Sequence, residues 1–391
     1  MNSKTSKSLL AASLCSLTLN LAAQTAFGID HGPYLQEVTE TGATVVFTTS
    51  AKAFSWVEIK PHGSESEPPQ RCYSSKDGLK AAYNTFNSVR IEALQPAARY
   101  DYRIVSKEMK DFQPYKVTFG DSIASEWFTF RTTDPQQKGA DIFVTSDMHG
   151  DAQKLETLLE KADWRSCDAF FYAGDMMNYI DRPEAPFAAF IDTSVRLFAS
   201  STPFEIVRGN HETRGNLART YSSYFPKKDN KIYGAYRIGD IMIVMLDSGE
   251  DKAENHWVYA GLTDYDAYRT EQAEWLRRLV KTPDYQNARY RIVICHFPLV
   301  MGQEWKDEQM WFGWDDAIRK FLPVLNDARV DLLVSGHTHR FFYHDRQADG
   351  NAFPVLEQGA TCAARLELHD GHIRVKVMDT EGRLLMDKNI Q

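Results

Sequence analysis

Aspartate, asparagine and histidine side chains follow five apolar segments of the 391-residue chain, each at the point where the segment ends. Each apolar run has the length and the content of Val, Ile, Phe and Leu that are typical of a buried strand. Ligands bind beyond the carboxyl ends of strands in open α/β sheets, so these side chains are expected to converge on one site. The five endings are Asp147-Met148-His149, Gly174-Asp175, Gly209-Asn210-His211-Glu212, His296 and Gly336-His337-Thr338-His339.

This set of side chains favours metal chemistry. Apart from His211 and Glu212, it offers two carboxylates, one amide and four imidazoles as donors. Oxygen and nitrogen donors without a thiolate suit Mn, Fe or Zn. The donors are too many for one tetrahedral ion, but they fit two ions that share a carboxylate, the arrangement that clamps both oxygens in phosphoryl displacement. The ions would also attract an anionic substrate to a chain with a formal net charge of −8.

Each ending also has a structural interpretation when taken alone. An Asp-x-His segment is compatible with a capping aspartate and a hydrogen-bonded histidine, and Gly-Asp is a common turn. Asn210 could cap a following helix. His337 and His339 lie on one side of the chain if that segment is extended. All five endings in this order, each after an apolar run, favour the metal site over a coincidence of such turns and caps.

The segment before these motifs reads as a separate β unit. From about Ile29 to Thr133, short runs of Val, Ile, Thr, Tyr and Phe alternate with turn residues, which predicts a β-sandwich of about 100 residues. It contains no group of candidate catalytic or metal-binding side chains, and it is interpreted as a packing or positioning module. The predicted strands are Ala43–Thr49, Ser55–Lys60, Asn87–Leu94, Arg99–Ser106 and Trp127–Arg131.

A polar connector, Thr132–Lys138, precedes a change of pattern. From Asp141 onward, strand-like runs alternate with predicted helices, which indicates an α/β domain with largely parallel central strands. The stretch Pro354–Asp387 is interpreted as the second sheet of the same domain. The predicted domains are therefore 29–133 and 139–391. The predicted helices are Ala152–Ala162, Ala188–Phe198 and Glu271–Val280.

The first 28 residues have the features of a secretory signal peptide. Lys4 and Lys7 precede an uncharged apolar run, Leu9–Ala23, and small residues follow it. Export to the periplasm or the medium is expected, with an uncleaved membrane anchor as the alternative. No later segment is long and apolar enough to span a bilayer. The acidic net charge argues against a broad nucleic-acid-binding surface.

The remaining cysteines give little guidance to function. Cys72, Cys167, Cys295 and Cys362 are widely separated, which is neither a disulfide framework nor the spacing of a metal site. The sequence fixes no oligomeric state.

The five endings together resemble the signature of the calcineurin-like metallophosphoesterases, over roughly Asp141 to the C-terminus. Leu94–Tyr102 resembles the strand entry of fibronectin type III domains, and the two-domain layout resembles that of purple acid phosphatases. The resemblance implies an α/β fold: a metallophosphoesterase β-sandwich core flanked by helices, preceded by a small all-β, fibronectin type III-like sandwich.

The resemblance also implies a role for each motif residue. One metal would be held by Asp147, His149, Asp175 and His339, and the second by Asp175, Asn210, His296 and His337, with Asp175 as the bridge. His211 would face the substrate as a general acid or as a stabiliser of the charge that develops on the phosphate. The expected reaction is attack of a metal-bridging hydroxide on a phosphate ester.

One position departs from the purple acid phosphatase pattern. In that family a tyrosine three residues after the bridging aspartate binds the ferric ion and gives the colour. Here the position holds Asn178, and Tyr179 comes one residue later. No tyrosinate colour is therefore expected, and the two divalent or mixed-valence ions that the resemblance implies are expected to be Mn, Fe or Zn.

The favoured function is a phosphatase for small-molecule phosphate monoesters. The nearest alternative is a phosphodiesterase acting on nucleotides or lipid headgroups, and the third is a non-catalytic binding scaffold. Arg208 and Arg214 flank the His211 motif and are compatible with either phosphate contacts or structural pairing. The aromatic-rich segment Glu304–Trp314 is interpreted as a cleft wall, a lid or interface packing.

Overall fold

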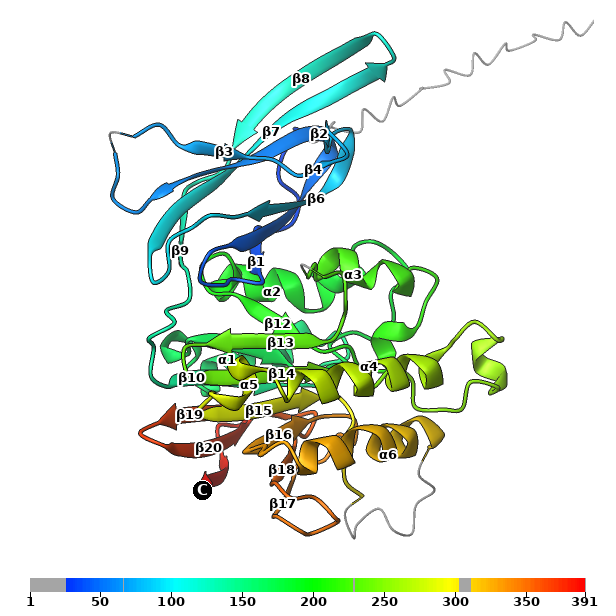
Figure 1. Cartoon of the computed structure of the whole chain (residues 1–391). Coiled ribbons are helices and arrows are strands. Elements are labelled where there is room, and N and C mark those ends of the chain that lie inside the picture. Colours follow the sequence, from blue (N-terminus) through cyan, green and yellow to red (C-terminus); the bar gives the residue numbers. More distant parts are fainter. Residues whose placement is uncertain (1–25, 66, 228, 302–310, 391) are drawn as a thin grey trace, which may run out of the picture.

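A small all-β unit stands on a larger layered α/β unit in the computed structural model of this chain (Figure 1). The structure describes residues 26–65, 67–227, 229–301 and 311–390. Nearly all of the predicted signal peptide, and most of the aromatic-rich segment Glu304–Trp314, lie outside the described residues. Among the described helices, none combines the length and the hydropathy that crossing a bilayer requires.

One long strand organises the N-terminal unit. The first part of β2 (Ala43–Pro61) pairs with β1 (Tyr34–Gln36) and β6 (Asn84–Ile91), and its second part pairs with β3 (Gln70–Cys72) and β7 (Arg99–Gln113). The two groups of strands enclose one apolar core, as expected for a sandwich. Further strands pair with β7, namely β8 (Lys116–Ala124) and β9 (Phe128–Arg131), while β4 (Ser75–Lys76) and β5 (Leu79–Lys80) form a separate hairpin.

The continuity of β2 corrects the sequence-based expectation of two strands, Ala43–Thr49 and Ser55–Lys60. No Gly or Pro lies between Ala43 and Lys60, so nothing in the backbone ends the strand. The interruption is a register shift between Thr48 and Ala53 instead.

The larger unit contains two six-stranded sheets packed face to face. The first has the order β12-β11-β10-β19-β20-β21, and the second β13-β14-β15-β16-β18-β17. Within them β10, β11 and β12 are parallel, as are β14, β15, β16 and β18. The strands of the first sheet are β10 (Ala140–Thr145), β11 (Ala169–Tyr172), β12 (Phe204–Ile206), β19 (Cys362–His369), β20 (His372–Asp379) and β21 (Leu384–Ile390). Those of the second sheet are β13 (Gly234–Ile238), β14 (Ile241–Leu246), β15 (Tyr290–Cys295), β16 (Leu332–Ser335), β17 (Phe342–His344) and β18 (Val355–Glu357).

Helices cover the outer face of each sheet. A continuous helical run from Phe187 to Ala199, containing α2 (Asp192–Ser194), packs with α1 (Ala152–Lys161) in a core on the first sheet. The second sheet is covered by α4 (Tyr265–Leu279) and α6 (Phe312–Asn326). The layers therefore run helices, sheet, sheet, helices, which is the expected fold class. Two further short α-helices are α3 (Tyr221–Tyr224) and α5 (Pro283–Gln286).

The C-terminal strands differ from the expectation that Pro354–Asp387 forms the second sheet of the domain, because the stretch contributes strands to both sheets. Only β18 joins the second sheet, and β19, β20 and β21 extend the first sheet beside β10. From Ala364 to Leu368, β19 alternates between buried and half-buried residues, which suits an antiparallel strand with one face less covered than the other.

Candidate metal centre

Both sheets contribute to the site, because five strands deliver its side chains. Asp147, Asp175 and Asn210 follow β10, β11 and β12 of the first sheet, while His296 and His337 follow β15 and β16 of the second. Backbone hydrogen bonds tie the loops together: the amide of Asp147 donates to Gly174 O over 3.0 Å and that of Gly336 to His296 O over 2.9 Å. The facing sheets thus bring remote segments to one edge.

The first group of predicted ligands lies together on one side of the site. The Nε2 atoms of His149 and His339 are 2.9 Å apart, and His339 Nε2 is 3.4 Å from Asp147 Oδ1. His149 Nε2 lies 4.0 Å from Asp175 Oδ2. One donor atom each from Asp147, His149 and His339 fits within 4.8 Å, close enough to hold a common ion.

The second group meets at the side chain of Asn210. Its Oδ1 lies 3.1 Å from His296 Nε2 and 3.2 Å from His337 Nδ1. His296 Nε2 is also 3.2 Å from Asp175 Oδ2. Asp175 therefore stands between the two groups, and the structure brings all seven predicted ligands to one place.

Hydrogen bonds around these donor atoms fit the binding of a cation. His296 Nδ1 donates to Ala173 O over 2.8 Å, which turns Nε2 toward Asp175 and Asn210. Asn210 Nδ2 faces Asp251 Oδ2 at 3.4 Å, so Oδ1 faces the imidazoles. Second partners of this kind orient metal ligands in proteins, and hard oxygen and imidazole nitrogen donors suit Mn, Fe or Zn.

The backbone of the site adopts an uncommon conformation. Five predicted ligands have positive φ angles: Asp147 (57°), His149 (52°), Asp175 (53°), His337 (76°) and His339 (58°). Asp and His tolerate this region better than most residues with a side chain. His337 and His339 are thus not in an extended segment, and the alternation of an extended chain does not explain their shared position.

Burial and neighbouring charges shift the pKa values at the site. Burial, with the nearby carboxylate of Asp175, raises the pKa of Asp147 to about 6. Burial alone would raise the pKa of Asp175, but His296 holds it well below its usual range. Burial lowers the pKa of His149 to about 4 and that of His337 far below its ordinary value. The neutral rings of His149 and His337 keep lone pairs for a cation.

His211 differs from the ligands in its contacts. Its Nδ1 donates to Asn178 O over 3.2 Å, and its Nε2 lies 3.0 Å from Arg214 Nη1. The ring is 4.6 Å from that of His149, so it borders the site. Since an arginine N–H occupies the Nε2 lone pair, these contacts favour a role other than metal binding.

Asn178 and Tyr179 occupy the positions where the sequence departs from the purple acid phosphatase pattern. Asn178 Nδ2 donates to His149 O over 2.8 Å, so Asn178 joins the loops of His149 and His211. Tyr179 is 51% exposed.

Sequence reasoning missed Glu212, which is fully buried beneath the site. Its carboxylate accepts backbone N–H groups of Asp175 (2.9 Å), Met176 (2.6 Å), Met177 (3.3 Å) and Gly209 (2.9 Å). It thereby joins the loop of Asp175 to the loop of Asn210 and His211. The only signal in the sequence is its place in Gly209–Glu212.

Aromatic side chains pack around His337. Ring centres of Phe297, Trp314 and Trp311 lie 4.4, 5.5 and 6.2 Å from that of His337. The described end of the aromatic-rich segment thus forms a wall beside one predicted ligand. The four described cysteines, Cys72, Cys167, Cys295 and Cys362, are free thiols.

Comparison with known proteins identifies the type of domain. The family model of the calcineurin-like phosphoesterases matches residues 140–341, a little more than half of the chain. The match includes all of the five motifs.

Relatives and a solved structure extend the comparison. Purple acid phosphatase 22 of Arabidopsis thaliana is 24% identical over 236 residues, 58% of this chain and 50% of that protein. Probable purple acid phosphatase 20 of the same plant is 23% identical over 251 residues, 61% of this chain and 54% of that protein. The chain thus spans about half the length of these curated relatives. The purple acid phosphatase PPD1 of yellow lupin seeds is similar in fold, with a TM-score of 0.67 over 92% of this chain and 74% of that one at 14% identity.

Proposed function

The chain belongs to the calcineurin-like phosphoesterase family, and on that premise we propose that it is a two-metal phosphatase for small-molecule phosphate monoesters. The observation that carries the proposal is the convergence of seven oxygen and nitrogen donors from five strand ends around Asp175. The likeness to purple acid phosphatases supports a monoester as the substrate.

Within this proposal, two groups of residues hold two ions. Asp147, His149 and His339 would hold one ion, and Asn210, His296 and His337 would hold the other, with Asp175 available to both. Bound divalent or mixed-valence ions, Mn, Fe or Zn, would supply positive charge against the phosphate and lower the pKa of a water molecule.

His211 assists departure of the leaving oxygen in this proposal. Its side chain is 26% exposed, beside the buried carboxylate of Asp175, so a substrate can reach it from solvent. It acts as a general acid once Nε2 is protonated and releases its contact with Arg214, or as a stabiliser of the charge that develops on the phosphate. The hydrogen bond from its Nδ1 to Asn178 O fixes the orientation of the ring.

Two other functions use the same fold. A phosphodiesterase for nucleotides or lipid headgroups would need the same ions and a differently shaped cleft. A non-catalytic scaffold would not need the donors, and all seven are present in this chain.

An ester panel tests the proposal. Aryl phosphomonoesters and diesters with the same leaving group are offered to the protein loaded with Mn, Fe or Zn, and metal content is measured in parallel. We expect monoester hydrolysis that a chelator abolishes and added metal restores. His211→Ala should reduce kcat on the order of 10²-fold or more with two ions retained per chain. Preferential diester hydrolysis, or no hydrolysis by fully loaded protein, would contradict the proposed function.

Export is a separate part of the proposal. It is supported by the basic and apolar N-terminal residues, from Lys4 to Ala23. N-terminal sequencing of the protein recovered outside the cytoplasm should begin near residue 29. A mature protein that still begins at Met1 would contradict it.

A further inference from the structure

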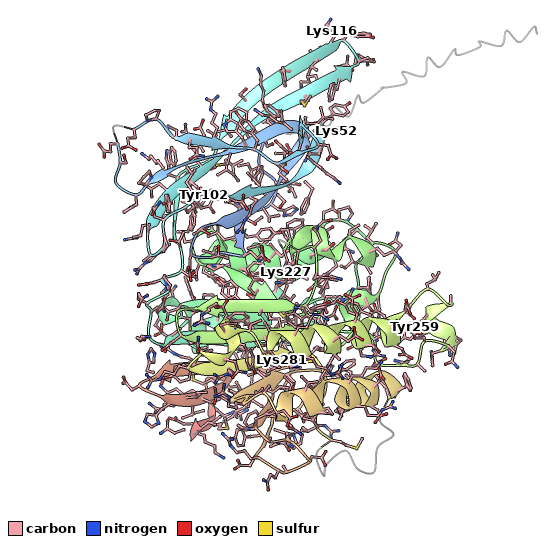
Figure 2. The ribbon with its side chains drawn as sticks, in the orientation of Figure 1. Lys52, Tyr102, Lys116, Lys227, Tyr259 and Lys281 are labelled. Atoms are coloured by element: carbon pink, nitrogen blue, oxygen red, sulfur yellow. The ribbon has the colours of Figure 1, made fainter. Side chains whose placement is uncertain are left out.

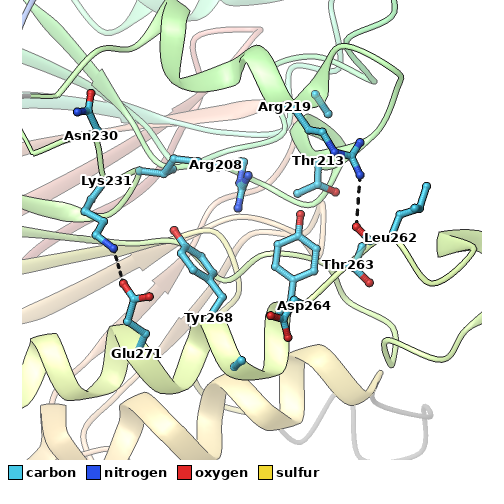
Figure 3. A pocket seen from close by; sticks show the side chains of 14 residues that line it. Arg208, Thr213, Arg219, Asn230, Lys231, Leu262, Thr263, Asp264, Tyr268 and Glu271 are labelled. Atoms are coloured by element: carbon cyan, nitrogen blue, oxygen red, sulfur yellow. Dashed lines mark hydrogen bonds and ion pairs between the residues drawn. The ribbon is translucent and has the colours of Figure 1, made fainter.

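Two arginines flank the His211 motif, and the structure separates their roles. Arg208 turns away from the predicted ligands: its Nη2 lies 2.8 Å from Asp247 Oδ2, and its side chain is only 12% exposed. It lines a pocket of about 570 Å³, shown in Figure 3, whose lining includes neither His211 nor a predicted ligand. Tyr265 and Tyr268 flank its guanidinium there, with ring centres at 5.6 and 5.9 Å.

Arg214 turns toward the site instead. It follows the short 3-10 turn His211–Thr213, which returns the chain so that Arg214 lies beside His211. Its Nη1 is 3.0 Å from His211 Nε2, and the side chain is 35% exposed. The guanidinium is therefore next to the donor cluster and open to solvent on one side.

Buried acids fix the orientation of this guanidinium. Arg214 Nε is 3.1 Å from Glu250 Oε1, and its Nη2 is 3.8 Å from Asp251 Oδ2. Glu250 in turn accepts the hydroxyls of Thr213 (2.7 Å) and Tyr259 (2.9 Å). With the acids held in place, the guanidinium is preorganised and loses little freedom when it binds a ligand.

The same acids connect Arg214 to the metal centre. Asp251 Oδ2 faces Asn210 Nδ2 at 3.4 Å, and Asp251 Oδ1 pairs with Lys252 Nζ at 2.7 Å. Arg214 and Asn210 are thus held by one carboxylate at one edge of the site.

From this geometry we propose that Arg214 binds a non-bridging oxygen of the substrate phosphate and makes the site selective for phosphomonoester dianions. The inference rests on the proposed function. A guanidinium has five N–H donors. The contacts to Glu250 and His211 engage three of them, and Asp251 lies 3.8 Å from Nη2, so the second N–H of Nη1 stays available for a phosphate oxygen.

The selectivity follows from charge and from the number of oxygens. A monoester phosphate carries a charge near −2 and three strong acceptor oxygens above its second pKa. A diester carries a single charge and has only two non-bridging oxygens. Charge-assisted bonds to a guanidinium are among the strong hydrogen bonds in proteins, so loss of Arg214 should harm monoester binding more than diester binding.

The experiment compares three variants in the metal-loaded full chain. The first variant, Arg214→Gln, removes the positive charge. The second combines Arg214→Gln with Glu250→Gln, so that the buried carboxylate of Glu250 is not left without its Arg214 partner. Arg219→Gln is the matched control, because among the described residues this exposed arginine hydrogen-bonds only to the carbonyl of Leu262, at 3.3 Å. The readouts are kcat and KM for a monoester and a diester, the affinity for inorganic phosphate by calorimetry, metal content and thermal stability.

We expect both Arg214 variants to weaken phosphate binding and to lower monoester kcat/KM by roughly 10- to 100-fold, the range for hydrogen bonds to charged groups. Diester kcat/KM should change by less than about 3-fold, and two ions should stay bound. Equal losses for both esters with unchanged phosphate affinity would overturn the inference. Absence of turnover in the wild type, with phosphate affinity still dependent on Arg214, would overturn the proposed function and leave the Arg214 contact standing.

Discussion

At the scale of single residues, Glu212 shows how one buried side chain shapes a site that it does not line. Each of its two oxygens accepts two backbone N–H groups, from Asp175, Met176, Met177 and Gly209. Burial and the negative charge of Asp175 raise its pKa to about 8, so the N–H groups offset an unfavourable environment for a carboxylate.

Replacing Glu212 should disturb both stability and metal binding. In Glu212→Gln one acceptor oxygen becomes an NH₂ group, which cannot accept the two N–H groups that it faces. Leaving buried donors unpaired costs about 1–3 kcal/mol. We expect a free energy of unfolding reduced by that amount in urea titrations, together with reduced metal content. Glu274→Gln, on the exposed face of α4, is the control, and an effect no larger than that of the control would argue against this role.

The sequence predicts a site residue well when its type and its place directly after an apolar strand both indicate a ligand. Asp147 and His296 follow apolar strands, so their placement at a strand end could be predicted. The roles of Glu212 and Asn178 could not, because they depend on which loops lie next to each other. The acids Glu250 and Asp251 are fully buried beside the site without any motif that marks them.

At the scale of elements, the strand-end loops approach one another so closely that side chains would not fit at some positions. A Cβ atom at Gly336 would collide with the carboxylate of Asp147 and would lie 2.5 Å from Ser146 Oγ. The absence of a side chain there lets the loop after β16 pass over the end of β10.

Gly336→Ala should therefore displace Asp147. Overpacking of this kind costs about 1–3 kcal/mol. We expect metal content to fall well below two ions per chain, measured by elemental analysis, and phosphatase activity to fall with it. Gly234→Ala in β13 is the control, because its Cβ would meet only Lys227 Cδ at 3.9 Å. Unchanged metal content in Gly336→Ala would show that Asp147 adapts or is not a ligand.

The elements themselves were predicted unevenly. Amphipathic α1 and the strands β10, β11 and β15 follow from their apolar patterns. The edge strand β8 was missed because its alternation is limited to Val117 and Phe119 and is followed by the polar and small residues Gly120, Asp121 and Ser122. The sequence also could not predict which sheet β19 joins, because β19 pairs with a strand, β10, that lies more than 200 residues earlier in the chain.

At the scale of the whole molecule, tyrosines join the N-terminal sandwich to the α/β unit. The hydroxyl of Tyr34 donates to Tyr224 O over 2.8 Å, that of Tyr102 to Ser200 O over 2.7 Å, and that of Tyr236 to Val38 O over 2.7 Å. All three rings are buried. Figure 2 shows Tyr102 in the N-terminal sandwich, where it belongs to β7. The two units are thus packed together without a flexible gap at these points.

Truncation of Tyr34 should destabilise this contact. Tyr34 is fully buried, and loss of a large aromatic side chain from a core costs about 3–5 kcal/mol. We expect Tyr34→Ala to lower the denaturation midpoint strongly, whereas Tyr115→Ala, at a fully exposed position, should leave it unchanged. Similar midpoints for the two variants would mean that the interface contributes little to stability.

The domain limits 29–133 and 139–391 stay predictions, which limited proteolysis of these variants can examine.

The positive φ angles of five predicted ligands have a consequence for stability. Each such residue with a side chain carries a conformational cost on the order of 1–3 kcal/mol, which glycine would avoid. If these positions did not have to bind ions, substitution of Asp147, His149 or His339 by glycine would relieve this cost and raise the thermal stability of the protein. This chain carries residues with side chains at all five places, and the binding of ions would offset their conformational cost.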